Sequence, residues 1–257
     1  MIFDSHAHYD DRAFDEDREV LLNSMRESGV EYILNAGSSM ASLGRTLELM
    51  DRYPFVYGAL GIHPSDIADL DESGLEWIRQ KLMHPKAVAV GEIGLDYYWD
   101  KEDDVQARQR EWFARQLELA LELDKPVVIH SREAAKDTYD VLKACGGSRI
   151  RSVVHCFSYT KETALEYLKW DYYFGIGGVV TFSNGRKLKE AVEHIPLERI
   201  LLETDSPYLA PVPFRGKRND SRHLTYVAEA IAQIKGTDAA TVIEVTNRNA
   251  KTFFGIE

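Results

Sequence analysis

Met1-Ile2-Phe3-Asp4-Ser5-His6-Ala7-His8 opens the chain and decides between two fold classes. Its short apolar start predicts a buried strand over Met1–Asp4. An open, doubly wound sheet usually follows its first strand with a glycine-rich turn, whereas this strand runs directly into Ser5-His6-Ala7-His8. The segment therefore favours a closed parallel barrel over the open sheet.

Alternation of short apolar runs with longer amphipathic stretches continues to the end of the chain. The predicted strands are Met1–Asp4, Glu31–Ala36, Phe55–Leu60, Ala87–Gly91, Pro126–Ile129, Ser152–Val154, Tyr172–Gly177 and Arg199–Glu203. Helical patterns include Glu16–Glu27, Met40–Arg52, Gly74–Met83, Asp104–Leu123, His223–Ile234 and Ala239–Phe253. Eight such βα units without a linker predict one (β/α)₈ TIM barrel domain over residues 1–257, with its active site at the C-terminal ends of the strands.

Composition narrows the class of protein further. The 257 residues include only two cysteines, which cannot form a disulfide framework, and no apolar run is long enough to cross a membrane. The N-terminal residues lack the layout of a signal peptide, so we expect a cytoplasmic location without membrane association. The net charge of −11 argues against a general polyanion binder but not against an enzyme that adds positive charge with divalent ions.

Polar residues with metal-ligand chemistry follow the apolar runs. His6 and His8 are two positions apart, so in an extended strand their imidazoles point to the same side. The ends of four further runs carry a His or a carboxylate: Glu92, His130, His155 and Asp205. In a barrel these strand ends form one ring, which predicts a metal site built by His6, His8, Glu92, His130, His155 and Asp205.

Six nitrogen and oxygen ligands exceed what one ion with open positions needs, so two divalent ions are predicted, with one carboxylate bridging them. The alternative is that these polar residues merely begin the loops after the strands. It can account for any one of the positions, but less well for all of them together. Glu203 precedes Asp205 by two residues, which predicts that it lies deeper and orients a ligand. Strand alternation is expected to turn Cys156 away from the face that His155 uses.

The sequence resembles the TatD family of metal-dependent deoxyribonucleases in the amidohydrolase superfamily. The resemblance spans the chain and rests on Phe3-Asp4-Ser5-His6-Ala7-His8, Gly61-Ile62-His63-Pro64, Gly91-Glu92-Ile93-Gly94-Leu95-Asp96-Tyr97, His130-Ser131-Arg132, His155-Cys156-Phe157-Ser158 and Glu203-Thr204-Asp205-Ser206-Pro207-Tyr208-Leu209-Ala210-Pro211.

The resemblance implies a barrel that hydrolyses DNA, with exonuclease action from the 3′ side. It places one ion on His6, His8, Glu92 and Asp205, and a second ion on Glu92, His130 and His155. Glu92, shared by both ions, and Asp205, a candidate proton acceptor, are then the predicted catalytic residues. The family is usually described as Mg-dependent, whereas mixed imidazole and carboxylate ligands suit Mn, Zn, Fe or Co better.

Candidate substrate contacts lie near the same strand ends. Arg132 is expected to point into the cleft and fork onto a phosphate, and His63 to sit on the rim beside the substrate. After the eighth strand, a basic loop offers Arg215, Lys217 and Arg218 at the place where barrel enzymes often bind phosphate. Loop aromatics on this rim, Tyr98, Trp99 and Tyr159, are candidates for stacking on nucleobases.

Three functions fit these residues. The leading interpretation is a divalent-metal deoxyribonuclease that acts on a DNA single strand or 3′ end and needs no obligate protein partner. An amide or ester hydrolase acting on an acylated nucleotide or RNA end would use the same ions, because fold and ligands do not fix the substrate. A metal-stabilised nucleic-acid-binding scaffold is a third alternative, disfavoured by the acidic total and by ligands sufficient for an open metal position.

Overall fold

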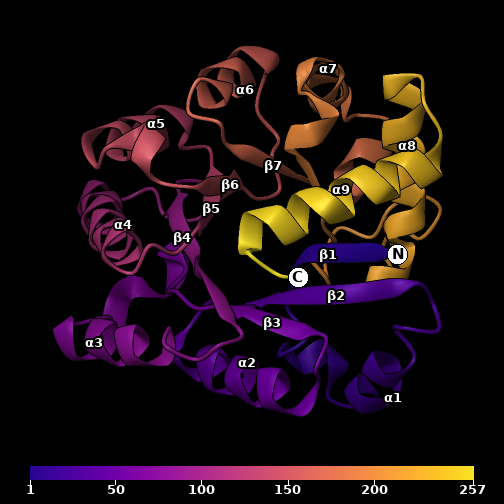
Figure 1. Cartoon of the computed structure of the whole chain (residues 1–257). Coiled ribbons are helices and arrows are strands. Elements are labelled where there is room, and N and C mark those ends of the chain that lie inside the picture. Colours follow the sequence, from indigo (N-terminus) through magenta and orange to yellow (C-terminus); the bar gives the residue numbers. More distant parts are fainter.

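Eight parallel strands form one sheet in the chain order β1 to β8, and the computed structural model describes all residues from 1 to 257. The strands are β1 (Ile2–Ala7), β2 (Val30–Ala36), β3 (Val56–Ala59), β4 (Ala87–Asp96), β5 (Val127–Arg132), β6 (Ser152–Val154), β7 (Tyr173–Ile176) and β8 (Ile200–Leu202). Helices α1 to α8 surround the strands (Figure 1). The predicted TIM-barrel-like α/β fold is confirmed.

The helices are α1 (Arg18–Asn23), α2 (Met40–Arg52), α3 (Glu72–Lys81), α4 (Asp103–Glu122), α5 (Ala135–Ala144), α6 (Lys161–Leu168), α7 (Arg186–His194), α8 (Leu224–Lys235) and α9 (Ala239–Phe254). Local chemistry sets their ends: Asp238 accepts from Thr241 N at the start of α9, and Gly255 ends it at φ 67°. No helix is both long and apolar enough to cross a membrane, and the expected cytoplasmic location stays a prediction.

The barrel closes between β1 and the segment that follows β8. The amide of Asp205 donates to the carbonyl of His6 at 2.9 Å, and the amide of His8 donates to the carbonyl of Ser206 at 2.8 Å. Asp4, fully buried, reinforces this seam by accepting from the Thr204 hydroxyl at 2.7 Å. The closure therefore places His6, His8 and Asp205 together at one seam of the barrel.

Helix α9 covers the opposite end of the barrel. In Figure 1 it crosses in front of the strands, with the C-terminus beside the middle of the barrel. Its Phe253 and Phe254, and Ile256 just after the helix, join a buried apolar cluster with Phe3 and Val88 from the first halves of β1 and β4. This end of the barrel is consequently closed by packed apolar side chains, and the other end remains for the functional site.

Several element boundaries differ from the sequence prediction, and three examples show the reasons. Strand β4 continues to Asp96 rather than ending at Gly91, because β5 pairs beside it as far as Arg132. Strand β3 ends at Ala59, so His63 lies beyond it and caps a short 3₁₀ helix, Pro64–Asp69. Helix α1 ends at Asn23 rather than Glu27, where the Ser24 hydroxyl bonds the carbonyl of Leu21 and competes with helical pairing.

Candidate metal centre

Glu92 lies at the middle of the polar end of the barrel and is only 3% exposed. Its two carboxylate oxygens face different sets of imidazoles. Oε2 lies 3.2 Å from His6 Nε2 and 3.7 Å from His8 Nε2. Oε1 lies 2.6 Å from His130 Nδ1 and 3.1 Å from His155 Nε2. One carboxylate thus contacts ligand-type groups from four other positions of the barrel.

Asp205 completes the first of these sets. Its Oδ1 lies 3.4 Å from His8 Nε2 and 3.9 Å from His6 Nε2. The residue adopts φ 55°, a left-handed conformation that Asp tolerates better than most side chains. His6, His8 and Asp205 have ligand atoms close enough to hold one ion together. The structure thus gathers all six predicted metal-site residues, with Glu92 in contact with four imidazoles and Asp205 with two of the same four.

The histidine rings are oriented by partners on their outer sides. His8 Nδ1 donates to the Ala36 carbonyl at 2.8 Å. His155 Nδ1 lies 3.2 Å from Glu203 Oε1, and His130 Nε2 lies 3.1 Å from Asp96 Oδ2. A ring whose outer nitrogen donates presents its other nitrogen as an acceptor, and here that nitrogen faces an acidic oxygen.

Acceptors facing acceptors at about 3 Å require positive charge between them, either as protons on the rings or as bound cations. The buried His6 Nδ1, His155 Nδ1 and Glu203 Oε2 also lack hydrogen-bond partners within the protein, so the 3.2 Å contact of His155 with Glu203 is an electrostatic one. The donor set of imidazoles and carboxylates is the one that divalent transition ions prefer. These residues therefore fit a metal centre.

Protonation states follow from the same geometry. Burial favours neutral Glu92, but the neighbouring His155 and His6 hold its pKa well below the usual range. Burial alone would lower the pKa of His8, whereas Asp205 and Glu92 raise it to about 9. In the metal-free protein the site thus neutralises its carboxylates with protons, which ligands must release when an ion binds.

His63 lies closer to the metal-ligand groups than the sequence indicated. Its Nε2 is 3.9 Å from Glu92 Oε1, and its ring packs edge-on against His130 with centroids 4.3 Å apart. His63, Glu92 and His130 form a second group able to hold an ion. Burial and the charge of His130 lower the pKa of His63 to about 3, so its ring is neutral near pH 7.

Glu203 orients His155 from below, as its position two residues before Asp205 suggests. Its carboxylate also accepts from the Cys156 amide at 2.5 Å. A side chain on Gly175 would overlap the Glu203 carboxylate, with a Cβ only 1.9 Å from Oε2, so this glycine makes room for it. Glu203 also shares a possible ligand group with His6 and His155.

A cavity of about 850 Å³ opens above the metal-ligand groups. Its lining includes His8, Glu92, His130, His155, Asp205, His63 and Arg132. Cys156 also lines it, contrary to the expectation from strand alternation, because β6 ends at Val154 and Cys156 takes a left-handed φ of 46°. Seven carboxylates line the cavity, and Arg132 is the single lysine or arginine among the lining residues.

The basic loop after β8 does not contribute to this lining. Arg218 makes a two-pronged ion pair with Asp17 at 2.8 and 2.6 Å and donates to the Ala13 carbonyl. The Arg215 guanidinium stacks 3.5 Å above the ring of Phe182. Lys217 is exposed and makes no ion pair. Among the predicted substrate contacts, the structure places only Arg132 and His63 in the cavity.

Two carboxylates that sequence reasoning left without a firm role support the centre. Asp96 Oδ2 lies 3.1 Å from His130 Nε2 and so orients this ring. Asp4, in β1, accepts hydrogen bonds from the hydroxyls of Thr204 and Ser221. Burial raises the pKa of Asp4 to about 7 despite these hydrogen bonds. The even spacing of Asp96 from Glu92 would have placed both on one face of a longer β4. Nothing local links Asp4 to partners about 200 residues away.

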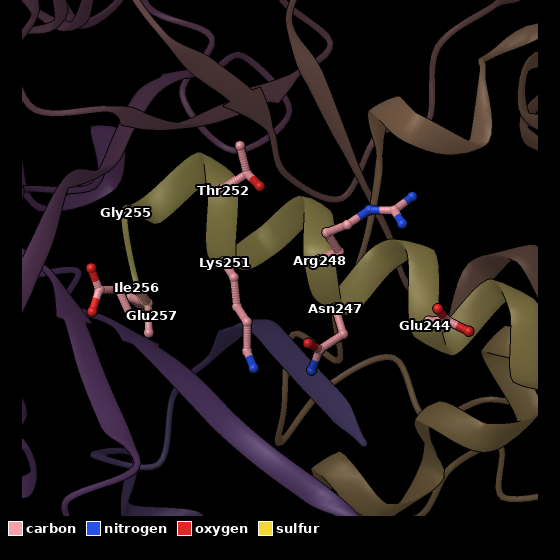
Figure 2. A pocket seen from close by; sticks show the side chains of 8 residues that line it. All are labelled: Glu244, Asn247, Arg248, Lys251, Thr252, Gly255, Ile256 and Glu257. Carbon is pink, nitrogen blue, oxygen red and sulfur yellow. The ribbon is translucent and has the colours of Figure 1, made fainter.

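A second hollow, of about 560 Å³, lies on the outer side of α9 and is unlike the metal centre. Figure 2 shows Asn247 and Lys251 projecting from the same side of the helix. Both are already paired with Glu31, at 3.0 and 2.8 Å. None of the groups of metal-ligand residues lies in this hollow; all of them lie at the other end of the barrel.

Comparison with known proteins agrees with this geometry. The family model described as TatD related DNase matches residues 3–255. The chain belongs to the TatD family. It is 41% identical over its whole length to an uncharacterized metal-dependent hydrolase, YabD, of Bacillus subtilis, all of which it covers. As a TatD-family member, it is a metal-dependent hydrolase.

Two further relatives extend this assignment. A 3′-5′ ssDNA/RNA exonuclease, TatD of Escherichia fergusonii, is 32% identical to this TatD-family chain, with 99% of each chain covered. The crystal structure of the TatD homologue YjjV from Escherichia coli superposes with a TM-score of 0.92 at 31% identity, covering 100% of this chain and 98% of that one. The fold and the family are thus consistent along the full chain.

Proposed function

We propose that this protein hydrolyses phosphodiester bonds of DNA from the 3′ end, with a single strand as substrate and two divalent ions as cofactors. The observation that carries the proposal is Glu92, whose two oxygens face two separate sets of ligands within 4 Å. The membership of a DNase family and the similarity to an ssDNA/RNA exonuclease support the choice of substrate.

His6, His8, Glu92 and Asp205 would hold one ion, and Glu92, His130 and His155 the second. Divalent ions at such a site supply Lewis acidity, which lowers the pKa of water and offsets charge on the phosphate. Glu92 and Asp205 are the catalytic residues, together with the imidazoles that position the ions. The ligand chemistry admits Mn, Zn or Mg.

Asp205 is the proton acceptor in this proposal. Its side chain is 19% exposed and reaches the cavity, unlike the almost fully buried Glu92. Burial opposes its ionisation, but His8 and the nearby His155 lower its pKa, so the carboxylate is ionised and able to take a proton at neutral pH. His63 and Arg132 also line the cavity and would contact the substrate.

The test is a metal-reconstituted activity screen. Protein freed of metal by chelation is supplied with Mn, Zn, Co or Mg and given 5′-labelled single-stranded DNA, duplex DNA, RNA and an acylated nucleotide. We expect a ladder of labelled fragments that shorten from the 3′ end, fastest on single strands, and elemental analysis showing about two ions per chain. Cleavage inside the strand, or one ion at full occupancy, contradicts the corresponding part of the proposal.

The seven carboxylates around the cavity favour a second candidate function, which the same screen tests. They disfavour a substrate with many phosphates, so an ester or amide of a single nucleotide fits the charge of the cavity as well. Hydrolysis of the acylated nucleotide without any cleavage of DNA or RNA would reject the nuclease and establish this rival.

A further inference from the structure

Two large aromatic side chains are exposed on the turn after β4, at the rim of the cavity. Trp99 is 66% exposed and Tyr98 is 39% exposed, and their rings meet edge-on with centroids 4.7 Å apart. Trp99 also lines the cavity above the metal centre. Large exposed aromatics at the edge of a polar cavity mark a place where another flat, apolar surface binds.

This turn is held in place by a residue that also contacts the metal centre. Asp96 Oδ1 accepts from the amides of Tyr98 and Trp99 at 3.0 and 3.2 Å, while Oδ2 faces His130 Nε2 at 3.1 Å. One carboxylate therefore sets both the direction of a metal-site imidazole and the position of the aromatic turn. The backbone of Trp99 is thereby anchored beside the metal-ligand groups.

Arg132 lies beside the same turn. It pairs in register with Asp96 on the neighbouring strand, and its guanidinium carbon is 3.9 Å from the Tyr98 ring centroid and 5.5 Å from that of Trp99. The guanidinium forms no hydrogen bond or ion pair within the protein. Stacking covers one face of the group and leaves its N–H edge free for a planar or tetrahedral anion.

We propose that Trp99 and Arg132 form a subsite for one nucleotide, with the base stacked on the Trp99 indole and a phosphate held by the Arg132 guanidinium. The inference rests on the proposed function and names the unit of substrate that the cavity recognises. Stacking on an indole accepts any base, because every base has a flat π face.

Charge limits the subsite to one nucleotide. Asp10, Asp11, Asp66 and Asp100 line the cavity, with no lysine and no second arginine among its lining residues. Away from the metal-ligand groups, a further phosphate would therefore meet these carboxylates and no cationic side chain other than Arg132. The recognised unit is the terminal nucleotide of a chain, which agrees with removal of nucleotides from one end.

Binding of two small ligands tests the role of Trp99. Thymidine 5′-monophosphate carries a base, whereas deoxyribose 5-phosphate has the same phosphate without one, and calorimetry measures both with metal-free and Mn-loaded protein. We expect Trp99→Ala to weaken binding of the nucleotide by about 5- to 100-fold and of the sugar phosphate by less than 2-fold. Trp99→Phe should retain most of the affinity, and the exposed but distant Met83→Ala is the matched control.

Equal loss for both ligands, or no loss for either, would overturn the stacking role. For Arg132, Arg132→Gln should weaken both phosphate ligands and reduce the dependence of their affinity on salt, while quenching of tryptophan fluorescence by thymidine is unchanged. A loss for thymidine as large as for its phosphate contradicts the assignment of Arg132.

These measurements separate the subsite from the proposed function. Nucleotide binding that depends on Trp99, in a protein that cleaves no DNA or RNA under any metal, rejects the nuclease and keeps the subsite. DNA cleavage that is insensitive to Trp99→Ala on both short and long single strands keeps the nuclease and rejects the subsite.

Discussion

The two ends of the barrel are built from the same strands but with opposite chemistry. Strand β1 gives Phe3 to the apolar end and His6 to the metal centre, and β4 likewise gives Val88 and Glu92. At the amino ends of the strands, α9 closes a dry cluster that includes Phe254. At the carboxyl ends, imidazoles and carboxylates face one another around an open cavity.

This difference shows how the molecule supports an unfavourable site. Burying ionisable groups costs free energy unless they are paired. The metal centre gathers several such groups, with imidazole nitrogens facing carboxylate oxygens. Burial of apolar surface at the other end and around the sheet offsets that cost. Substitutions at the two ends should therefore affect different measurable properties.

The largest effect is expected from Asp205→Asn. The amide keeps an oxygen that could still reach an ion, but the substitution removes the carboxylate that we propose accepts a proton. Loss of a general base costs about 10²- to 10⁴-fold in rate. We expect a folded variant that retains at least one ion and an unchanged melting temperature, measured by steady-state kinetics, elemental analysis and calorimetry.

His155→Ala is the matched comparison for Asp205→Asn. It should lose metal first and regain part of its activity when metal is supplied in excess. If excess metal restores Asp205→Asn to nearly the wild-type rate, Asp205 is only a ligand.

Phe254→Ala should produce the reverse pattern. The ring is 4% exposed and lies against Phe3 and Phe253, with centroids 5.8 and 4.8 Å away. Removing a buried Phe costs about 3–5 kcal/mol of unfolding free energy, which lowers the melting temperature by roughly 10 °C in a chain of this size. Metal content and kcat, measured well below the transition, should be unchanged. Loss of metal from the folded variant would show that the two ends are coupled.

A smaller effect is expected from Glu203→Gln, a substitution that preserves shape. The amide oxygen can still accept from His155, but the charge that favours this ring as a ligand is lost. Outer partners of metal ligands typically change affinity by about 10- to 100-fold. Titration with Zn should show weaker binding at one of the two metal sites and little change at the other. Equal weakening of both ions would mean that Glu203 affects the whole end of the barrel.

Arg218→Ala should have the smallest effect, because its partner Asp17 is about 43% exposed. Pairs of this kind contribute about 0.2–1 kcal/mol. The hydrogen bond from Arg218 lowers the pKa of Asp17, so the contribution is present above the ordinary carboxyl pKa and is lost as pH falls through the lowered value. The difference in thermal stability between wild type and variant should be full at pH 7 and should shrink as the pH is lowered below the ordinary carboxyl pKa. A large rise in KM for DNA with unchanged stability would instead return Arg218 to phosphate binding.

The sequence by itself determined the barrel and which imidazoles and carboxylates gather at its polar end. Short apolar runs that each end in a His or a carboxylate can place those side chains together only at one end of a parallel sheet, as His6 and His130 illustrate. This part was predictable because strand periodicity and strand polarity are local properties that the order of residues encodes directly.

Only the tertiary structure decided which groups surround those residues. It brought Asp4 to Thr204, directed Arg218 to Asp17 instead of the cavity, and placed Cys156 on the cavity wall through a left-handed backbone. It also joined the aromatic turn to the metal centre through Asp96. Such contacts depend on how loops distant in sequence pack in space, and no local pattern of residues carries that information.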